Sequence, residues 1–192
     1  MMALTMAVAG SSAVAADWTL DTAHSSVNFT VTHMMVSRVH GQFTDFDGTA
    51  SFDPKDLSTI KANFSAKVAS INTDNEKRDN HLRSGDFFDA EKAPTLTFVS
   101  KKAVQTGPGA AKLTGDLTIR GVTKEVTFDV EGLNTEIKAP GAERYVVGGS
   151  ATASVNRHDF GVSWNSTLDA GGVVVGDTVK IALELQFNRS AS

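Results

Sequence analysis

Apolar and polar side chains alternate with a period of two along most of this chain, and no other feature constrains its fold as strongly. Within residues 111–120, Leu113, Leu117 and Ile119 share one face, while charged and hydroxyl side chains occupy the other. Successive side chains of a β-strand point to opposite faces, so this alternation predicts a half-buried strand. The same reading predicts strands near residues 25–33, 39–53, 60–68, 95–106, 122–131, 145–156 and 179–187.

The number and spacing of these segments are typical of an all-β fold with about eight antiparallel strands. The phase of the alternation changes within residues 39–53, because Phe43 and Phe46 lie three positions apart. A bulge or a sharp bend is therefore expected there. The chain has 192 residues, 41% of them hydrophobic, which suits one domain with a proper core. We expect that domain to span residues 17–192.

Charge and cysteine content exclude two classes of protein. The formal net charge is -4, and Lys and Arg form no cluster, so the sequence has no basic footprint for nucleic acid or for an anionic membrane surface, and nucleic acid is not an expected partner. The chain has no cysteine, so its stability does not come from disulfides.

The first 16 residues carry no charge and end in Ala13-Val14-Ala15-Ala16, which offers a cleavage site of the small-x-small type. We predict that residues 1–16 are an export signal and that the mature protein is soluble. A signal usually begins with Lys or Arg, whereas the first basic side chain here is Arg38, so the signal itself is expected to be truncated. The alternative is a buried N-terminal helix.

A charged stretch, residues 72–98, interrupts the alternation. Thr73 and Glu76 fit a capping box, which predicts a short helix over residues 74–83. Its residues are nearly all charged, so the helix has no apolar stripe of its own, and burial of Phe87 and Phe88 under the strands is expected to hold it. We predict a cap over one end of the fold, around residues 74–90; an ordinary solvated crossover is the alternative.

The strand pattern leaves a ligand-holding barrel and a filled two-sheet sandwich both open, because each gives every strand one apolar face. Side-chain size favours the barrel. Eight strands leave just enough room for side chains or for one small ligand, and short linings favour the ligand. The short residues on the apolar faces are Ala62, Ala66, Ala111, Gly115, Gly149, Ala151 and Ala153.

Catalytic and metal-binding motifs are weak. The five His residues have no metal-ligand spacing, and no metal site is expected. Arg157, His158 and Asp159 are consecutive just after a predicted strand, which suggests a hydrolytic site. Neighbouring side chains on an extended segment point apart, however, so a bend-forming or capping role is favoured.

Four separated blocks resemble a known family. They are HSSVNFTVTHMMVSRVHGQF (24–43), INTDNEKRDNHLRSGDFFDAEKAPTLTF (71–98), LTGDLTIRGVTKEVTFDV (113–130), and NRHDFGVSWN (156–165) followed by GGVVVGDTVKIALEL (171–185). They are similar to the YceI-like, polyisoprenoid-binding family of bacterial exported proteins. The resemblance implies a lipocalin-like antiparallel barrel of eight strands, located in the periplasm and without catalytic activity. Its lumen would hold and transport a polyisoprenoid such as a quinone or a prenyl phosphate, with no other cofactor.

Strand phase and these blocks together give the candidate ligand-binding residues. They are Val27, Phe29, Val31, Phe43, Phe64, Phe87, Phe88, Leu96, Phe98, Leu117, Ile119, Val126, Phe128 and Trp164. The expected partners are the isoprenoid lipid and, transiently, a membrane; whether the protein forms a homodimer is left open. Two other functions remain as alternatives: a lipid-directed hydrolase that uses residues 157–159, and a filled β-domain with a structural or stress role.

Overall fold

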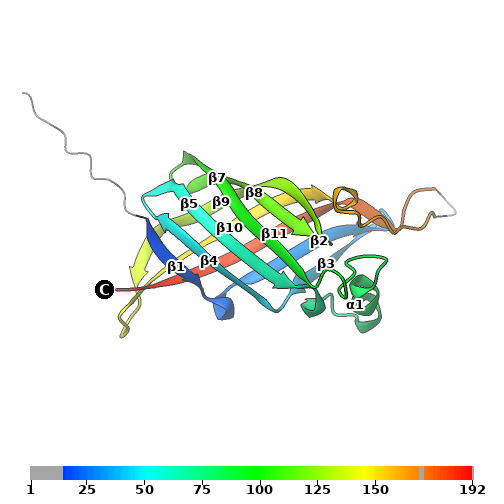
Figure 1. Ribbon diagram of the computed structural model, residues 1–192, viewed down its shortest axis with the longest axis horizontal. Coiled ribbons are helices and arrows are strands. Elements are labelled where there is room, and N and C mark those ends of the chain that lie inside the picture. Colours follow the sequence, from blue (N-terminus) through cyan, green and yellow to red (C-terminus); the bar gives the residue numbers. More distant parts are fainter. Residues whose placement is uncertain (1–14, 169–170, 192) are drawn as a thin grey trace, which may run out of the picture.

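The computed structural model describes residues 15–168 and 171–191, which form a single antiparallel β-sheet closed into a barrel (Figure 1). The sheet contains 11 strands. In chain order they are β1 (Ala16–Leu20), β2 (Ser26–His33), β3 (Ser37–Phe43), β4 (Phe46–Asp53), β5 (Asp56–Lys67), β6 (Ile71–Asn72), β7 (Thr95–Gly107), β8 (Ala110–Ile119), β9 (Val122–Lys138), β10 (Arg144–Asn156) and β11 (Val175–Ser190). One α-helix, α1 (Glu76–Arg83), and three 3-10 helices, η1 (Thr22–His24), η2 (Val68–Ser70) and η3 (Arg157–Phe160), complete the described elements.

The barrel closes where β1 pairs with β11. Its strands follow the order β1-β4-β5-β7-β8-β9-β10-β11, and the antiparallel pairing of Thr19 with Asn188 and of Leu20 with Phe187 completes the ring of eight. This confirms the predicted closed antiparallel barrel and excludes the two-sheet sandwich.

The three remaining strands lengthen one side of the barrel. Strand β2 pairs with residues 175–184 of β11, whereas β1 pairs with residues 187–188 of the same strand. Strand β3 pairs with β2, and β6 pairs with β3. Strand β3 ends at Phe43 and β4 begins at Phe46, so the extended chain is interrupted where the sequence predicts a bend. The β2–β3 hairpin therefore projects beyond the ring at the end where α1 lies (Figure 1).

Helix α1 begins later than the capping-box pattern predicts. Its N-cap is Asn75, whose side chain accepts a hydrogen bond from the backbone N–H of Arg78. Thr73 is instead buried, and its hydroxyl and backbone N–H both donate to Oδ1 of Asp79, at 2.5 and 2.9 Å. The assignment of Thr73 as the cap was wrong because Asn75 is an equally good capping residue two positions later.

Polar anchors fasten α1 to the barrel, in addition to the apolar contacts that the sequence predicts. The guanidinium of Arg83 donates to the backbone carbonyls of Ala69 and Ile71, at 3.0 and 2.8 Å. Arg78 donates to the carbonyl of Thr73 at 2.6 Å. A nearly all-charged helix is thus held by side chains that bind the backbone of the preceding segment, with Leu82 and Phe88 packed on the core below.

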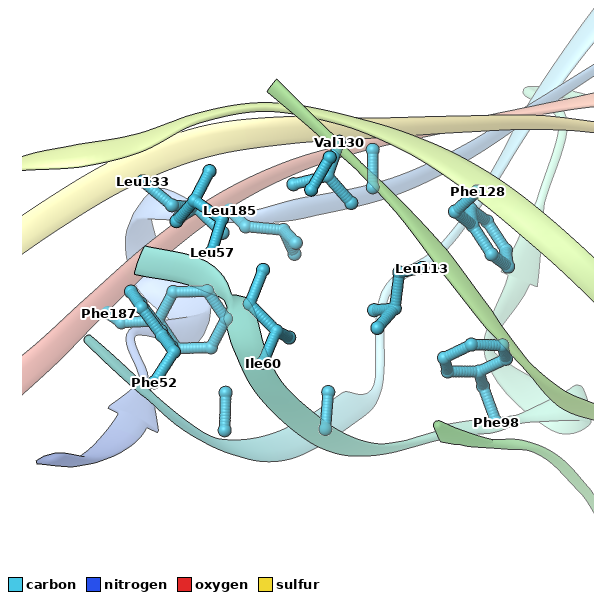
Figure 2. Packing of buried hydrophobic residues seen from close by; sticks show 14 of the residues in the cluster. Phe52, Leu57, Ile60, Phe98, Leu113, Phe128, Val130, Leu133, Leu185 and Phe187 are labelled. Atoms are coloured by element: carbon cyan, nitrogen blue, oxygen red, sulfur yellow. The ribbon is translucent and has the colours of Figure 1, made fainter. Parts of the chain in front are cut away.

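The end of the barrel away from α1 is packed with buried aromatic and aliphatic side chains. Trp18, Phe52, Leu57 and Phe187 are each at most 2% exposed, and side chains from opposite walls point toward one another across the interior (Figure 2). Ring stacking between Trp18 and Phe52, with centroids 5.2 Å apart, closes this end further. Ala16, which the sequence analysis assigned to the export signal, is the first residue of β1 and pairs with Phe52. Residues 1–14 of that predicted segment lie outside the described residues.

Candidate functional site

An apolar cavity of about 180 Å³ lies inside the barrel, at the end covered by α1. Of the 28 residues that line it, 24 are apolar, and the polar ones are Asn28, Ser65, Thr97 and Arg157. An apolar interior with so few polar groups suits a hydrocarbon and offers little to a polar ligand.

Twelve of the 14 candidate residues lie on the wall of this cavity. The strands β2, β3, β5, β7, β8 and β9 supply ten of them, and the segment after α1 supplies the other two. They are Val27, Phe29, Val31, Phe43, Phe64, Phe87, Phe88, Leu96, Phe98, Leu117, Ile119 and Phe128.

Val126 does not line the cavity, although its strand phase is correct. Its cross-strand partner is Gly115, and the ring of Phe98 lies over that glycine: a Cβ added to Gly115 would be 2.6 Å from Phe98 Cζ. Val126 therefore packs within the core cluster.

Trp164 is also absent from the cavity wall. Its ring centroid lies 5.2 Å from that of Phe87 and 5.0 Å from that of His81. Phe87 and His81 are themselves in edge contact, with centroids 5.0 Å apart. Trp164 thus joins the segment after η3 to the cap, and it contacts the cavity residue Phe87 from outside.

Part of the cavity wall is formed by residues that the sequence analysis did not name as candidates. Residues of β11 and the segment around η3 complete the lining. The alternation in residues 179–187 already indicates the inward face of β11, so this signal was present in the sequence. The additional apolar lining residues are Leu20, Phe46, Ala66, Leu82, Val155, Phe160, Val162, Val175, Val179, Ile181, Leu183 and Leu185.

Glycines opposite aromatic residues make room for the cavity. Gly48 pairs with Phe64, and a Cβ added to Gly48 would lie 2.2 Å from Phe64 Cδ1. The phenyl ring therefore lies over Gly48, against the wall of the barrel.

A second, smaller cavity of about 60 Å³ lies deeper in the barrel, and its lining is entirely apolar. Phe64, Phe98 and Phe128 line both cavities, and we call these three residues the aromatic septum. The rings of Phe98 and Phe128 meet edge to face, with centroids 5.1 Å apart (Figure 2). The short residues Ala62 and Ala151 line this second cavity. The lumen is thus neither an open tube nor a solid core.

Arg120, in the tight turn between β8 and β9, links the two segments that cover the cavity end. Its guanidinium donates to the carbonyl of Gly85, in the cap, at 2.7 Å, and also to the carbonyl of Gly161, just after η3. The sequence analysis did not single out this residue. An arginine in a hairpin turn carries no signal that distinguishes it from a solvated charge.

Arg157 is buried at the cavity wall, where its side chain is 4% exposed. Its guanidinium donates to the carbonyls of Val162, Trp164, Val175 and Gly176 and lies 3.5 Å from Asp177. Burial lowers the pKa of Arg157, and the carboxylate of Asp177 partly offsets this effect. Because each N–H group of the guanidinium has a protein acceptor, Arg157 fastens the segment after η3 to β11.

Arg157 and His158, two residues of the hydrolytic alternative, both approach Oδ1 of Asp177, which lies outside the predicted set. Arg157 is buried and donates to four backbone carbonyls, whereas His158 lies at the surface with its Nε2 2.9 Å from Asp177. Asn156 caps η3 by accepting a hydrogen bond from the backbone N–H of His158. This agrees with the bend-forming role that the sequence favours for this segment.

A closed antiparallel barrel of eight strands around an apolar cavity belongs to the class of lipocalin-like barrels. Residues 18–187 match the YceI-like domain, and this chain belongs to the YceI-like family. UPF0312 protein SAS2572 of Staphylococcus aureus (strain MSSA476) is 43% identical over 174 residues, which cover 91% of this chain and 98% of that protein.

Solved structures support the same relationship. The crystal structure of a Campylobacter jejuni YceI protein has 33% sequence identity and a TM-score of 0.71, and the match covers 83% of this chain and 90% of that one. A polyisoprenoid binding domain from Saccharophagus degradans, implicated in plant cell wall breakdown, has a TM-score of 0.62 with 15% identity and covers 88% of this chain and 97% of that one. At that identity the likeness is one of fold.

In residues 15–168 and 171–191, no helix has the length and apolar character needed to cross a bilayer. In the same part of the chain, His, Asp and Glu side chains form no group of three or more suited to a metal ion.

Proposed function

We propose that this protein is a non-catalytic carrier or reservoir for a long isoprenoid lipid of the quinone or prenyl phosphate type, held in the barrel lumen. The observation that carries the proposal is the cavity, whose wall is apolar at 24 of 28 positions. The resemblance of the fold to a polyisoprenoid binding domain supports the same class of ligand.

Burial of the lipid tail supplies enough free energy for binding without a precise polar site. Each buried methylene contributes about 0.8 kcal/mol, so a few isoprene units offer on the order of 10 kcal/mol before the costs of binding are subtracted. The barrel then selects for apolar character and for chain length, and the head group lies toward the end of the cavity covered by α1.

The size of the cavity indicates how a long tail is accommodated. A cavity of about 150 Å³ lined by Leu, Ile and Phe binds one benzene molecule. The main cavity, at about 180 Å³, therefore seats only one or two isoprene units as it stands. A longer tail must displace the aromatic septum to reach the second cavity, or move Phe87 and Phe88 of the cap. Rotation of phenyl side chains makes both changes feasible without breaking the sheet.

Mass spectrometry of solvent extracts from the purified protein tests this proposal, followed by addition of a polyprenyl alcohol and a quinone to the delipidated protein. We expect a prenyl lipid to be retained or taken up in a ratio of one per barrel. If no prenyl lipid is retained or taken up, the proposal is wrong.

The hydrolytic alternative is tested by the variant His158→Asn. A carrier keeps its lipid uptake, because His158 lies on the outer surface and contacts Asp177. Turnover of a prenyl ester or prenyl phosphate by the native protein, lost in this variant, would favour the enzyme.

We further infer that the protein acts in the periplasm. The uncharged segment of residues 1–16 and the membership of the YceI-like family support this location. Cell fractionation, with N-terminal sequencing of the mature protein, checks it.

A further inference from the structure

The tip of the β2–β3 hairpin exposes three consecutive apolar side chains. Met34 is 43% exposed, Met35 is 67% exposed and Val36 is 86% exposed. We call these three residues the hairpin tip. Isolated exposed apolar residues are normal on a protein surface, but three at the end of one projecting hairpin form a compact apolar point.

The backbone of the hairpin tip makes this choice of residues costly. Met34 and Met35 have φ values of 51° and 62°, and the N–H of Val36 donates to the carbonyl of His33 at 3.2 Å. The hairpin loop has three residues, and Met34 and Met35 are the two central residues of its β-turn. Both are left-handed, a conformation for which Asn-Gly is the preferred pair. Two methionines therefore occupy positions where stability alone favours small polar residues, which points to a role for their exposed side chains.

The hairpin tip lies just beyond the lipid cavity proposed above. The cavity wall reaches Val31 on β2 and Val175 on β11, and Val175 pairs with His33. Met34 follows Val31 by three positions, a distance of about 10 Å along an extended strand. The opposite end of the barrel is filled by Phe52 and Leu57, so the side of the barrel with the hairpin tip gives the shorter path to the cavity.

The charge of the hairpin differs from that of the whole chain. Residues 22–44 contain no Asp or Glu and include Arg38, whereas the chain has a formal net charge of -4. Arg38 is exposed on β3, four residues after Met34. Asp177, the acidic residue that follows Val175 on β11, is engaged by Arg157 and His158. The hairpin therefore brings one cationic side chain and no carboxylate to the surface around its tip, in contrast to the acidic chain as a whole.

We infer that the hairpin tip docks this protein onto an anionic lipid bilayer, inserting Met34, Met35 and Val36 into the interfacial region beside the cavity. This inference rests on the proposed lipid-carrying function, because a long prenyl chain is exchanged with a membrane and not with water. A second copy of the chain is the less suitable occupant, since a stable interface needs about 20–30 residues a side. Three apolar residues fit shallow insertion into a bilayer.

The test is vesicle flotation with two sets of vesicles, phosphatidylcholine alone and phosphatidylcholine mixed with phosphatidylglycerol. The tip variant is Met34→Asn/Met35→Gly/Val36→Thr, which installs the preferred turn residues and so preserves the fold. The matched control is Val104→Thr/Ile137→Thr, which removes two other exposed apolar side chains, 44% and 65% exposed, from β7 and β9. We expect the native protein and the control to float with the anionic vesicles, and the tip variant to lose binding about tenfold or more.

Loading of each protein with a polyprenyl alcohol from detergent solution separates this inference from the proposed function. Equal loading of native protein and tip variant, with flotation lost only in the variant, supports membrane docking. If the native protein loads lipid but floats with neither set of vesicles, or if the tip variant floats equally well, the docking inference is wrong. A dimer in sedimentation velocity that the tip variant abolishes, without vesicle binding, would also overturn it in favour of a second copy. Failure to load from detergent counts against the carrier function alone.

Discussion

The ring of Phe29 lies over Gly41, its cross-strand partner, so closely that a Cβ added to Gly41 would be 2.3 Å from Phe29 Cζ. Gly48 and Phe64 form the same arrangement on the next pair of strands, β4 and β5. In both pairs the missing side chain lets a phenyl ring lie flat against the wall of the barrel. The free volume of the cavity therefore depends on glycines that are not part of the cavity wall themselves.

Replacing these glycines is expected to fill the cavity. In Gly41→Ala and Gly48→Ala the new methyl group pushes the phenyl ring into the lumen, at a cost of about 1–3 kcal/mol in stability. Uptake of a polyprenyl alcohol, followed by mass spectrometry, should fall at least several-fold. Gly107→Ala is the control, because the nearest atom to its Cβ is 3.9 Å away. Unchanged uptake in both variants would show that the cavity does not hold the ligand.

The aromatic septum is expected to limit the length of the bound chain. Phe128→Leu shortens a side chain that lines both cavities, at a cost of about 0.5–3 kcal/mol in the free energy of unfolding. Competition among prenyl alcohols of increasing length should then shift toward longer chains relative to the native protein. The same length preference in both proteins would mean that the second cavity takes no part in binding.

The cap is expected to control retention of the ligand. Phe87 and Phe88 line the cavity from the segment after α1, so Phe87→Ala and Phe88→Ala should speed the loss of bound lipid. Phe87 is 6% exposed, and its truncation should also cost about 3–5 kcal/mol of stability, measured by urea unfolding. Unchanged melting together with unchanged lipid release would contradict the role of this segment as a cap.

Arg120 offers a way to loosen the cap without changing the cavity wall. Arg120→Gln removes the paired bonds to the carbonyls of Gly85 and Gly161. We expect faster exchange of bound lipid with a cost in stability of about 1–3 kcal/mol. Amide hydrogen exchange should rise in the segment after α1. Lys124→Gln, on the neighbouring strand β9, serves as the charge-matched control.

Protonation of Asp21 at low pH should weaken the contact between the end of β1 and β11, where the barrel closes. Its carboxylate accepts hydrogen bonds from Asn188 and Gln186 of β11, at 3.0 and 3.1 Å. The hydrogen bond from Asn188, with a smaller contribution from His24, lowers the pKa of Asp21 against the opposing effect of burial. Because the pKa is lower in the folded state, this stabilisation is present above the unfolded pKa and is lost as the pH falls through the folded value.

Urea unfolding of the native protein and of Asp21→Asn, at a series of pH values, measures this effect. At neutral pH the variant should be less stable by about 1–3 kcal/mol, as expected for hydrogen bonds to a charged group. The difference should shrink below about pH 4, where the unfolded carboxyl takes up its proton. A difference that stays constant down to acid pH would rule out this linkage.

The alternation of apolar and polar side chains predicted the barrel because every strand of a closed barrel has one face toward the interior and one toward solvent. Each strand therefore shows the same period of two. The bend near Phe43 and Phe46 was predicted for the same reason, since a change of phase must be accommodated by the backbone. Strand β1 was not predicted, because five residues are too few to show a clear alternation. It pairs with β4 and with the end of β11, whereas β2 pairs with an earlier part of β11.

The candidate residues line the cavity wherever the alternation along a strand is sufficient to decide which way a side chain points. Val126 lies away from the cavity wall, and the ring of Phe98, from another strand, covers its partner Gly115. No local pattern reports a contact of this kind between different strands. Arg157 and Arg120 were missed as structural anchors for a related reason. Their partners are backbone carbonyls, which every residue possesses, so the sequence does not mark them.

The pairing of β1 with β11 also bears on when the barrel forms during synthesis. Asp21 and Asn188, which hold the two strands together, are separated by 167 positions, so the ring cannot close until nearly all of the chain has been made. Contacts of such long range make folding slow. The apolar cavity is therefore absent until synthesis is nearly complete, and an open chain of this kind is the state that the export proposed above requires.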